Sequence, residues 1–446
     1  MKVLIISMFY PSMNVIASRR SEAYTKYLNL FGVHPTIVTN IWEKVPIPDS
    51  NRYLWKEHSK EQDIIIENNT HYSVIRLPRY ISKKQRLIDL LLKIPLAKSF
   101  VRYGLYYLGY FEPDLIYSYD AYKKFLYTHL QTNSYDLVLT IFSPHFHIRL
   151  GYDINKKFGI PFIGDYRDLW DNRLMNDELI KKYSEKFKNW QAKKWHRKWL
   201  NYSKMHSIVS GPWLEKLNYL TKREGGIVVT NGYENEIFET NHTTISDKYF
   251  YLTHTGRIYQ EHDYSYLFKT LNLFLGKLSS EQRKKVLIRF YAPVRADNYK
   301  DIRDNIPTEN LLIHGWISKE EVVKRLKESA IVFFPGWSKI KGWYPGKLFE
   351  YLGSQRNVLI TPTDSSVEEE IINYCKAGIC SSEIDVVATF LFEKFLEWEK
   401  HGSCKYEGIP ERIYEYTRES QIKKMVNTMR NILDLKSPIT SSNVKR

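Results

Sequence analysis

The stretch that decides the fold runs from Ile331 to Thr361 and reads IVFFPGWSKIKGWYPGKLFEYLGSQRNVLIT. Its first four residues are apolar and follow a helix-like segment, which is typical of a buried parallel strand. Pro345 and Gly346 predict a helix start, because a missing N–H costs nothing there and a missing Cβ lets a ligand approach. A second apolar run, from Val358 to Thr361, completes the order strand, loop, helix, strand.

Two charged residues, Lys347 and Glu350, lie three positions apart on one face of this helix, close to its start. Free backbone N–H groups, a lysine and the positive end of a helix dipole suit a phosphate. A carboxylate one turn further can accept two hydrogen bonds from a diol such as ribose. The residues therefore indicate a nucleotide-diphosphate site. An ordinary helix that docks on a sheet through Leu348, Phe349 and Leu352 explains them equally well.

The order of strand, loop and helix recurs along the chain and predicts parallel sheets with right-handed crossovers. A chain of 446 residues is too long for one ordinary core, so we expect two α/β domains. We place the first domain at 1–210 and the second at 211–412. An amphipathic helix should follow at 413–435, with Ile422, Met425, Met429 and Leu433 at helical spacing, and a polar tail at 436–446.

The composition, with 43% hydrophobic and 26% charged residues, is that of a globular chain. Three cysteines without metal-ligand spacing fit a reducing compartment. The N-terminus enters a strand at Val3 and lacks the layout of a signal peptide. No window approaches eighteen apolar residues, so we expect no membrane span and a cytoplasmic location.

The formal net charge is +16 and aromatic residues reach 15%, which fits binding of nucleic acid, anionic lipid or phosphorylated ligands, or only a solvated basic surface. The charge is dispersed and no nucleic-acid-binding motif occurs, so we expect no nucleic-acid partner. Residues 83–110 and 181–199 are basic and aromatic. Segment 83–110 is typical of an interfacial membrane helix, or of a docked surface helix, and Pro95 interrupts it.

Polar side chains follow several predicted strands of the first domain, at the sheet edge where open α/β folds bind ligands. Arg19 and Arg20 come after the first strand, and His145 and His147 follow a buried strand that ends at Phe142. The next strand leads into a carboxylate–arginine–carboxylate cluster formed by Asp165, Arg167 and Asp168. A structural ion-pair network is the alternative for this cluster, and a satisfied loop residue is the alternative for each histidine.

Seven landmarks in this order resemble the family 4 glycosyltransferases, and in particular the branch that builds bacterial capsule, O-antigen or exopolysaccharide. The landmarks span nearly the whole chain and are 17–20 (ASRR), 143–147 (SPHFH), 165–170 (DYRDLW), 229–233 (VTNGY), 255–259 (TGRIY), 314–318 (HGWIS) and 342–352 (GWYPGKLFEYL). The last landmark is the most specific.

The resemblance implies the GT-B fold, in which two Rossmann-like domains face each other across a cleft and a C-terminal helix crosses back to the first domain. It implies retaining transfer of a sugar from a nucleotide-diphosphate sugar to a hydroxyl, with no metal or other cofactor. The absence of an Asp-x-Asp sequence agrees with this, because the carboxylate pair that usually holds a metal–diphosphate is missing. A nucleotide-sugar 2-epimerase on the same fold and a catalytically inactive sugar- or polyanion-binding subunit remain alternatives.

The resemblance also assigns residues, and it makes Glu350 the ribose ligand. Glu350 matches the second glutamate of a pair in the family, Gly342 stands where the family has the first, and His262 stands where it has a lysine. The catalytic residues would be His147, Lys347 and Arg257. The donor-binding residues would be Glu350, Gly346, Tyr344, Gly256 and Trp316. The acceptor-side residues would be Arg19, Arg20, Asp165, Arg167 and Asp168.

The partners implied are a nucleotide-sugar donor and a lipid-linked saccharide acceptor at the inner face of the cytoplasmic membrane. Peripheral contact with anionic lipid would then come from the basic aromatic segments 83–110 and 181–199.

Overall fold

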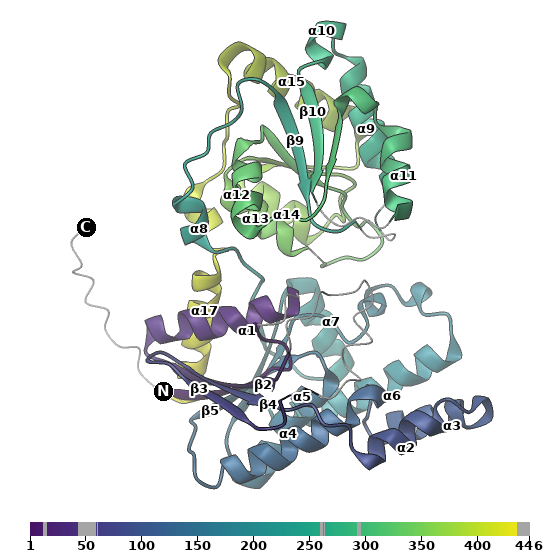
Figure 1. The fold of residues 1–446 in the computed structure, drawn as a ribbon, viewed down its shortest axis with the longest axis vertical. Coiled ribbons are helices and arrows are strands. Elements are labelled where there is room, and N and C mark those ends of the chain that lie inside the picture. Colours follow the sequence, from purple (N-terminus) through teal and green to yellow (C-terminus); the bar gives the residue numbers. More distant parts are fainter. Residues whose placement is uncertain are drawn as a thin grey trace. The chain divides into compact units, whose positions relative to one another are not determined.

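The computed structural model describes residues 1–11, 16–42, 59, 61–258, 262, 264–291, 296–343 and 345–434. The chain divides into two compact units, one formed by Met1–Thr230 with Ile422–Arg446 and the other by Asn231–Gln421. Each unit is built on its own mainly parallel sheet with helices packed against it (Figure 1).

The sheet of the first unit has the order β3-β4-β2-β1-β5-β6-β7-β8. Every neighbouring pair is parallel except β3 and β4, which are antiparallel. The strands are β1 (Lys2–Ile6), β2 (His34–Asn40), β3 (Ile65–Asn68), β4 (Ser73–Leu77), β5 (Leu137–Phe142), β6 (Phe162–Tyr166), β7 (Met205–Ile208) and β8 (Ile227–Val228).

Side chains alternate between the two faces of the sheet along each strand, so apolar strands present side chains on both faces. Helices pack on each face and bury them. In β1, Leu4 and Ile6 belong to one core cluster, and Val3 and Ile5 belong to another. Helices α4 and α5 pack on the first face, and α1 packs with α17 on the second (Figure 1). The helices are α1 (Ile16–Tyr27), α2 (Lys83–Leu91), α3 (Pro95–Tyr107), α4 (Ile116–His129), α5 (His145–Phe158), α6 (Tyr183–Leu200), α7 (Gly211–Thr221) and α17 (Arg418–Ile432).

The sheet of the second unit is parallel throughout, with the order β11-β10-β9-β12-β13-β14. Its core includes Phe250, Phe274, Phe395 and Trp398. The strands are β9 (Phe250–Thr255), β10 (Val286–Tyr291), β11 (Leu311–His314), β12 (Ile331–Phe334), β13 (Asn357–Ile360) and β14 (Gly378–Cys380). The helices are α8 (Asn235–Glu239), α9 (Tyr264–Gly276), α10 (Ser280–Arg283), α11 (Ala296–Asn305), α12 (Lys319–Glu328), α13 (Gly346–Ser354), α14 (Val367–Cys375), α15 (Ile384–His401) and α16 (Pro410–Tyr414).

The structure places the boundary between the units after Thr230, twenty residues later than we predicted. The reason is β8, which pairs with β7 and so adds Ile227 and Val228 to the first sheet. The predicted helix at 413–435 is two helices, α16 and α17, and Thr417 between them forms a bridge with Tyr233. From Ile422 onward α17 packs in the core of the first unit, as predicted. The tail at 436–446 lies outside the described residues.

Helix α1 begins at Ile16, and the short strand β3 forms one edge of the first sheet. Pro95 separates α2 from α3, as predicted. Within the described part of the chain, no helix is long and apolar enough to cross a bilayer.

Candidate functional site

The deciding stretch forms β12, a loop, α13 and β13, as predicted. Helix α13 begins at Gly346 and has Pro345 at its N-cap position. The apolar side chains of Leu348, Phe349 and Leu352 are fully buried, so the helix does dock on the sheet. Lys347 and Glu350 keep partial exposure on the same helix. The docked helix and the proposed nucleotide-diphosphate site, the two interpretations of this stretch, therefore concern two different faces of α13.

Lys347 reaches from the first turn of α13 to the end of β9. Its Nζ atom donates to the carbonyl oxygen of Arg257 at 3.1 Å and lies 3.2 Å from Nε2 of His254. Gly256 makes this approach possible, because its φ is +88° and a Cβ there would lie 3.4 Å from both Cε and Nζ of Lys347. The lysine, the glycine and the backbone of Arg257 thus meet at the carboxyl edge of the parallel sheet.

Burial lowers the pKa of Lys347 to about 7, while the negative charge of Glu350 acts in the opposite direction. The two hydrogen-bonding partners of Nζ, an imidazole nitrogen and a carbonyl oxygen, carry no formal negative charge. An ammonium group in this setting is stabilised when an anion arrives. The position and the lowered pKa of Lys347 therefore suit the binding of an anionic group such as a phosphate.

His254, which the sequence did not single out, holds this arrangement together. Its ring is 1% exposed and lies between the carbonyl oxygens of Phe333, 3.0 Å from Nδ1, and Gly256, 3.0 Å from Nε2. Burial and the charge of Lys347 hold the pKa of His254 well below its usual value. The ring is therefore neutral and has a single N–H. When Nδ1–H donates to Phe333, Nε2 is left to accept from Lys347.

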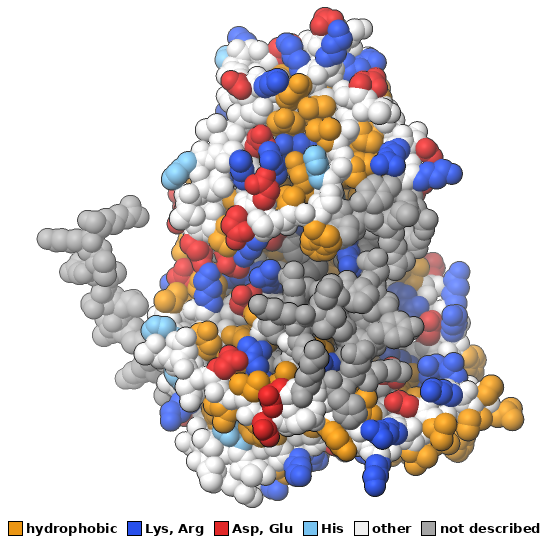
Figure 2. Space-filling model, in the orientation of Figure 1, with side chains coloured by type: hydrophobic (Ala, Val, Ile, Leu, Met, Phe, Trp, Pro, Cys, Tyr) orange, Lys and Arg blue, Asp and Glu red, His pale blue; other side chains and the backbone are white. Residues whose placement is uncertain are grey.

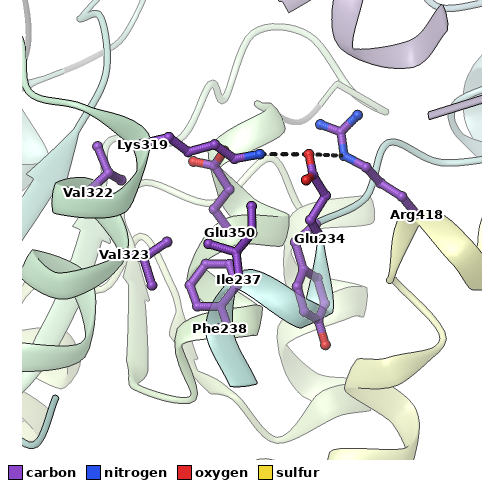
Figure 3. A pocket seen from close by; sticks show the side chains of 9 residues that line it. Glu234, Ile237, Phe238, Lys319, Val322, Val323, Glu350 and Arg418 are labelled. Atoms are coloured by element: carbon purple, nitrogen blue, oxygen red, sulfur yellow. Dashed lines mark hydrogen bonds and ion pairs between the residues drawn. The ribbon is translucent and has the colours of Figure 1, made fainter. Parts of the chain in front are cut away.

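Glu350 lines a pocket between α8, α12 and α13 (Figure 3). The floor of the pocket is apolar, and its rim carries an ion pair in which Nζ of Lys319 lies 2.6 Å from Oε1 of Glu234. The same oxygen is 3.9 Å from Nε of Arg418. Sequence reasoning missed these three residues because they come from separate elements and form no motif. The lining residues are Tyr233, Glu234, Ile237, Phe238, Lys319, Val322, Val323, Glu350 and Arg418.

The other predicted donor residues lie around the carboxyl edge of this sheet. Gly346 opens α13, the side chain of Arg257 is exposed after β9, and Trp316 is 71% exposed after β11. Tyr344 lies outside the described residues. His262 is 5% exposed and packs against the indole rings of Trp337 and Trp343 at centroid distances of 6.2 and 5.8 Å.

His262 does not supply the cation that the resemblance led us to look for at this position. Burial and the charge of Lys347 lower the pKa of His262 to about 3, so the ring is neutral at physiological pH. Lys347, by contrast, places an ammonium group at the start of helix α13.

In the first unit, Arg20 and Asp165 form a buried ion pair, with side chains 6% and 0% exposed. Nε and one terminal nitrogen of Arg20 donate to the two carboxylate oxygens at 2.7 and 2.6 Å. Tyr24 and Ser207 also donate to Asp165, at 3.0 and 2.6 Å. These contacts fit the alternative that we gave for Asp165, a structural ion-pair network. The acceptor-side role of Arg20 and Asp165 stays a prediction.

The remaining acceptor-side candidates are partly exposed and paired locally. Arg19 contacts Glu22 at 3.2 Å within α1, and Nε of Arg167 donates to Asp168 at 2.7 Å just after β6. These side chains can exchange a protein partner for a ligand at little cost, because exposed pairs contribute about 0–1 kcal/mol.

His147 is completely buried near the end of β5. Its Nδ1 lies 2.6 Å from the carbonyl oxygen of Ile141, and its Nε2 has no hydrogen-bonding partner in the part of the chain that the structure describes. Burial lowers the pKa of His147 to about 4. The ring is therefore neutral and offers Nε2 as an acceptor, which excludes a resting role as a protonated acid. His145 instead bonds His196 at 2.7 Å, so its contacts are those of a structural residue.

No group of three or more His, Cys, Asp or Glu side chains in the described ranges is arranged to hold a metal ion.

Comparison with known proteins shows similarity of structure without similarity of sequence. No model of a protein family matches the chain, and no curated protein matches it in sequence. Among solved structures, sucrose-phosphate synthase from Thermosynechococcus elongatus matches with a TM-score of 0.61 at 12% identity, over 97% of this chain and 99% of the other. The UDP-forming α,α-trehalose-phosphate synthase from Burkholderia xenovorans, in complex with glucose-6-phosphate, matches with a TM-score of 0.57 at 10% identity, over 96% and 100%.

A lipopolysaccharide outer core galactosyltransferase in its apo form matches with a TM-score of 0.54 at 14% identity, over 97% of this chain and 99% of the other. These matches cover nearly the full length of both chains. They show that the chain has the GT-B fold, with two Rossmann-like α/β units.

Proposed function

We propose that this protein is a retaining glycosyltransferase that moves a sugar from a nucleotide-diphosphate sugar to a hydroxyl group. The observation that carries the proposal is Lys347. Its ammonium group stands at the start of α13, held by Arg257 and His254 at the carboxyl edge of a parallel sheet. This edge is where open α/β sheets bind ligands. The three structural neighbours described above are, by their names, two sugar-phosphate synthases and a galactosyltransferase, which supports a nucleotide-sugar donor.

In this proposal the diphosphate of the donor lies against Lys347 and the free N–H groups of the first turn of α13. The guanidinium of Arg257, exposed after β9, supplies a second cation. Glu350 accepts hydrogen bonds from the ribose diol at its pocket. Fixed protein charge of this kind stabilises a departing diphosphate without a metal ion.

The transfer step breaks the bond between the anomeric carbon and the donor phosphate oxygen. The acceptor oxygen then bonds to the same carbon from the same face, and the departing phosphate oxygen takes the acceptor proton. The sugar passes through an oxocarbenium-like transition state. His147 contributes as a neutral acceptor through Nε2, because its lowered pKa leaves the ring neutral and its one N–H, on Nδ1, faces the carbonyl oxygen of Ile141.

Donor affinity is expected to fall as the pH rises above about 7. The free protein holds Lys347 at a pKa of about 7, and a bound diphosphate raises this pKa. The complex therefore binds more protons than the free protein, and affinity is full below the free pKa and decreases above it by at most about tenfold per pH unit. Among the described residues, His254, His262 and Glu350 are titratable groups that interact with Lys347.

Isothermal titration calorimetry with a nucleotide sugar at several pH values measures this dependence. The diphosphate of a nucleotide sugar stays fully ionised across the neutral range, so the change reports the protein. The Lys347→Ala variant is the control, and its weaker residual affinity is expected to show no such decline. A wild-type affinity that does not vary with pH would contradict the assignment.

The acceptor in this proposal is a lipid-linked saccharide of bacterial surface polysaccharide synthesis, and α3 is the membrane contact. None of its residues is buried, and Leu96 and Phe100, one turn apart, are 94% and 83% exposed. Figure 2 shows hydrophobic side chains gathered with lysine and arginine side chains at the lower right, where Figure 1 places α3. Further along the helix, α3 contacts α6 through an edge contact of Tyr103 and Phe187 at 4.8 Å.

The positive charge of the basic residues around α3 favours an anionic bilayer as the partner of this surface. Lys93, Lys98 and Arg102 flank the exposed apolar side chains in sequence, which is the layout of a helix that lies in a membrane interface. Each basic residue near an anionic surface contributes about 1 kcal/mol. The apolar side chains then enter the boundary between headgroups and acyl chains.

The double variant Leu96→Ser with Phe100→Ser is expected to weaken binding to anionic vesicles at least about tenfold, because each apolar side chain contributes roughly 1.5–3 kcal/mol when fully buried. Co-sedimentation with phosphatidylglycerol-containing vesicles measures this. Leu30→Ser is the matched control, since Leu30 is 60% exposed and lies in the first unit away from α3. Equal sedimentation of the double variant and the wild type would remove α3 from the contact.

The enzyme class is tested by nucleotide release from UDP-, GDP- and dTDP-sugars, with and without acceptor. A transferase releases nucleotide in proportion to the acceptor that it glycosylates. An epimerase would instead release a free epimerised sugar when no acceptor is present. An inactive binding subunit would show nucleotide-sugar binding without either product.

A further inference from the structure

Glu368, in the first turn of α14, is a buried carboxyl group that the donor site described above does not use. Its side chain is 0% exposed, and neither carboxyl oxygen has a hydrogen-bonding partner among the described residues. A polar group buried without a partner is costly, and natural structures keep few of them. The free-energy cost of burying the Glu368 carboxyl therefore indicates a role beyond packing.

The carboxyl group lies directly beneath the loop that joins β12 to α13. A Cβ added to Gly336, the second residue of that loop, would stand 3.1 Å from Oε2 of Glu368 and would overlap the carbonyl oxygen of Pro362. Only a glycine fits there. The same loop ends at Gly346 and Lys347, so Glu368 supports one end of the segment whose other end holds the donor diphosphate.

A second carboxyl group, that of Asp364, meets the loop further along. Asp364 is 3% exposed and accepts from the backbone N–H of Ser366 at 2.9 Å. Burial raises the pKa of Asp364 to about 6, and the N–H groups of Ser366, Gly342 and Glu368 act against this rise. Asp364 therefore accepts hydrogen bonds from backbone N–H groups, among them that of Gly342, whereas Glu368 accepts none from the described residues.

The chemistry of Glu368 fits a hydroxyl group. Burial, reinforced by the charge of Asp364, raises the pKa of Glu368 well above its usual value and so favours the protonated carboxyl. A protonated carboxyl both donates and accepts one hydrogen bond, which is the complement of a sugar hydroxyl. A phosphate would instead meet an uncharged group next to a carboxylate.

We propose that Glu368 recognises a hydroxyl group of the donor sugar and thereby selects among nucleotide sugars. The inference rests on the proposed function, because it needs a donor bound at Lys347. Gly336 lies against the carboxyl, so this proposal requires the sugar to displace that part of the loop when it binds. Hydroxyl recognition also fits the glycine at position 342, where no side-chain carboxylate is present to meet the sugar.

The test compares the affinities of nucleotide sugars with those of the matching nucleoside diphosphates, UDP, GDP and dTDP, by isothermal titration calorimetry. The Glu368→Met variant keeps the volume of the side chain and removes both hydrogen bonds. We expect it to bind the nucleotide sugar about three- to tenfold more weakly and the nucleoside diphosphate unchanged. Its melting temperature should equal or exceed that of the wild type, because an unpartnered buried polar group has been removed.

Two further variants keep the proposal falsifiable if this one does not fold. Glu368→Asp withdraws the carboxyl by one methylene and should lose the same selectivity. Glu370→Met changes an exposed glutamate in the same turn of α14 and should change nothing. A wild-type ratio of the two affinities in both Glu368 variants overturns the inference while leaving the proposed function intact. Failure of the wild-type protein to bind any nucleotide or nucleotide sugar overturns both.

Discussion

The Lys347→Ala variant is expected to lose glycosyl transfer by a factor of about 10²–10³. Lys347 places its ammonium group where the negative charge of the leaving diphosphate develops, with Arg257 and His254 fixing its position. Removing one such preorganised donor costs about 2.7–4 kcal/mol of transition-state stabilisation, by analogy with oxyanion sites. Nucleotide release at saturating donor and acceptor measures the loss in kcat.

Lys339→Ala is the matched control for this prediction. Lys339 is an exposed lysine in the loop that precedes α13, so its removal changes the net charge equally without touching the helix start. We expect it to retain wild-type turnover. If both lysine variants keep wild-type turnover and donor affinity, Lys347 is not part of the donor site.

The Asp165→Asn variant is expected to destabilise the first unit by about 3–5 kcal/mol. The substitution leaves the guanidinium of Arg20 buried without its carboxylate, and breaking a buried pair from one side is strongly destabilising. A loss of this size lowers the melting temperature of a unit of this length by roughly 6–20 °C. Thermal or urea unfolding followed by tryptophan fluorescence measures it.

Asp168→Asn is the matched control, because it makes the same chemical change three residues away. The Arg167–Asp168 pair has side chains 25% and 30% exposed, and pairs of this kind contribute about 0–1 kcal/mol. An Asp165 variant as stable as the Asp168 variant, but impaired in acceptor use, would contradict the structural role and support the acceptor-side role predicted for Asp165.

The sequence predicted helix α13 well because its signals are local. Pro345 and Gly346 mark the start of α13, and the spacing of Lys347 and Glu350 follows from helical geometry. The apolar runs on either side became β12 and β13. Such features depend on neighbours in the chain, which a sequence displays directly.

The partners of these residues could not be predicted in the same way. His254 lies 93 residues before Lys347, at a strand end where a histidine is equally typical of a core residue. Arg20 and Asp165 are 145 residues apart, and only their burial decides between a structural pair and a ligand site. The predicted boundary between the units was wrong for a related reason. Strand β8 has two residues, which is too short to show the hydrophobic periodicity of a strand.

The central claim is that the second unit binds a nucleotide-diphosphate sugar through Lys347. Calorimetric titration of the wild-type protein and the Lys347→Ala variant with UDP-, GDP- and dTDP-sugars tests it most directly. We predict saturable binding of at least one donor by the wild type, and binding at least tenfold weaker by the variant, in line with the loss of one strong charge-assisted hydrogen bond. Equal affinity of the two proteins for the donor, or no binding of any donor by the wild type, would contradict the account.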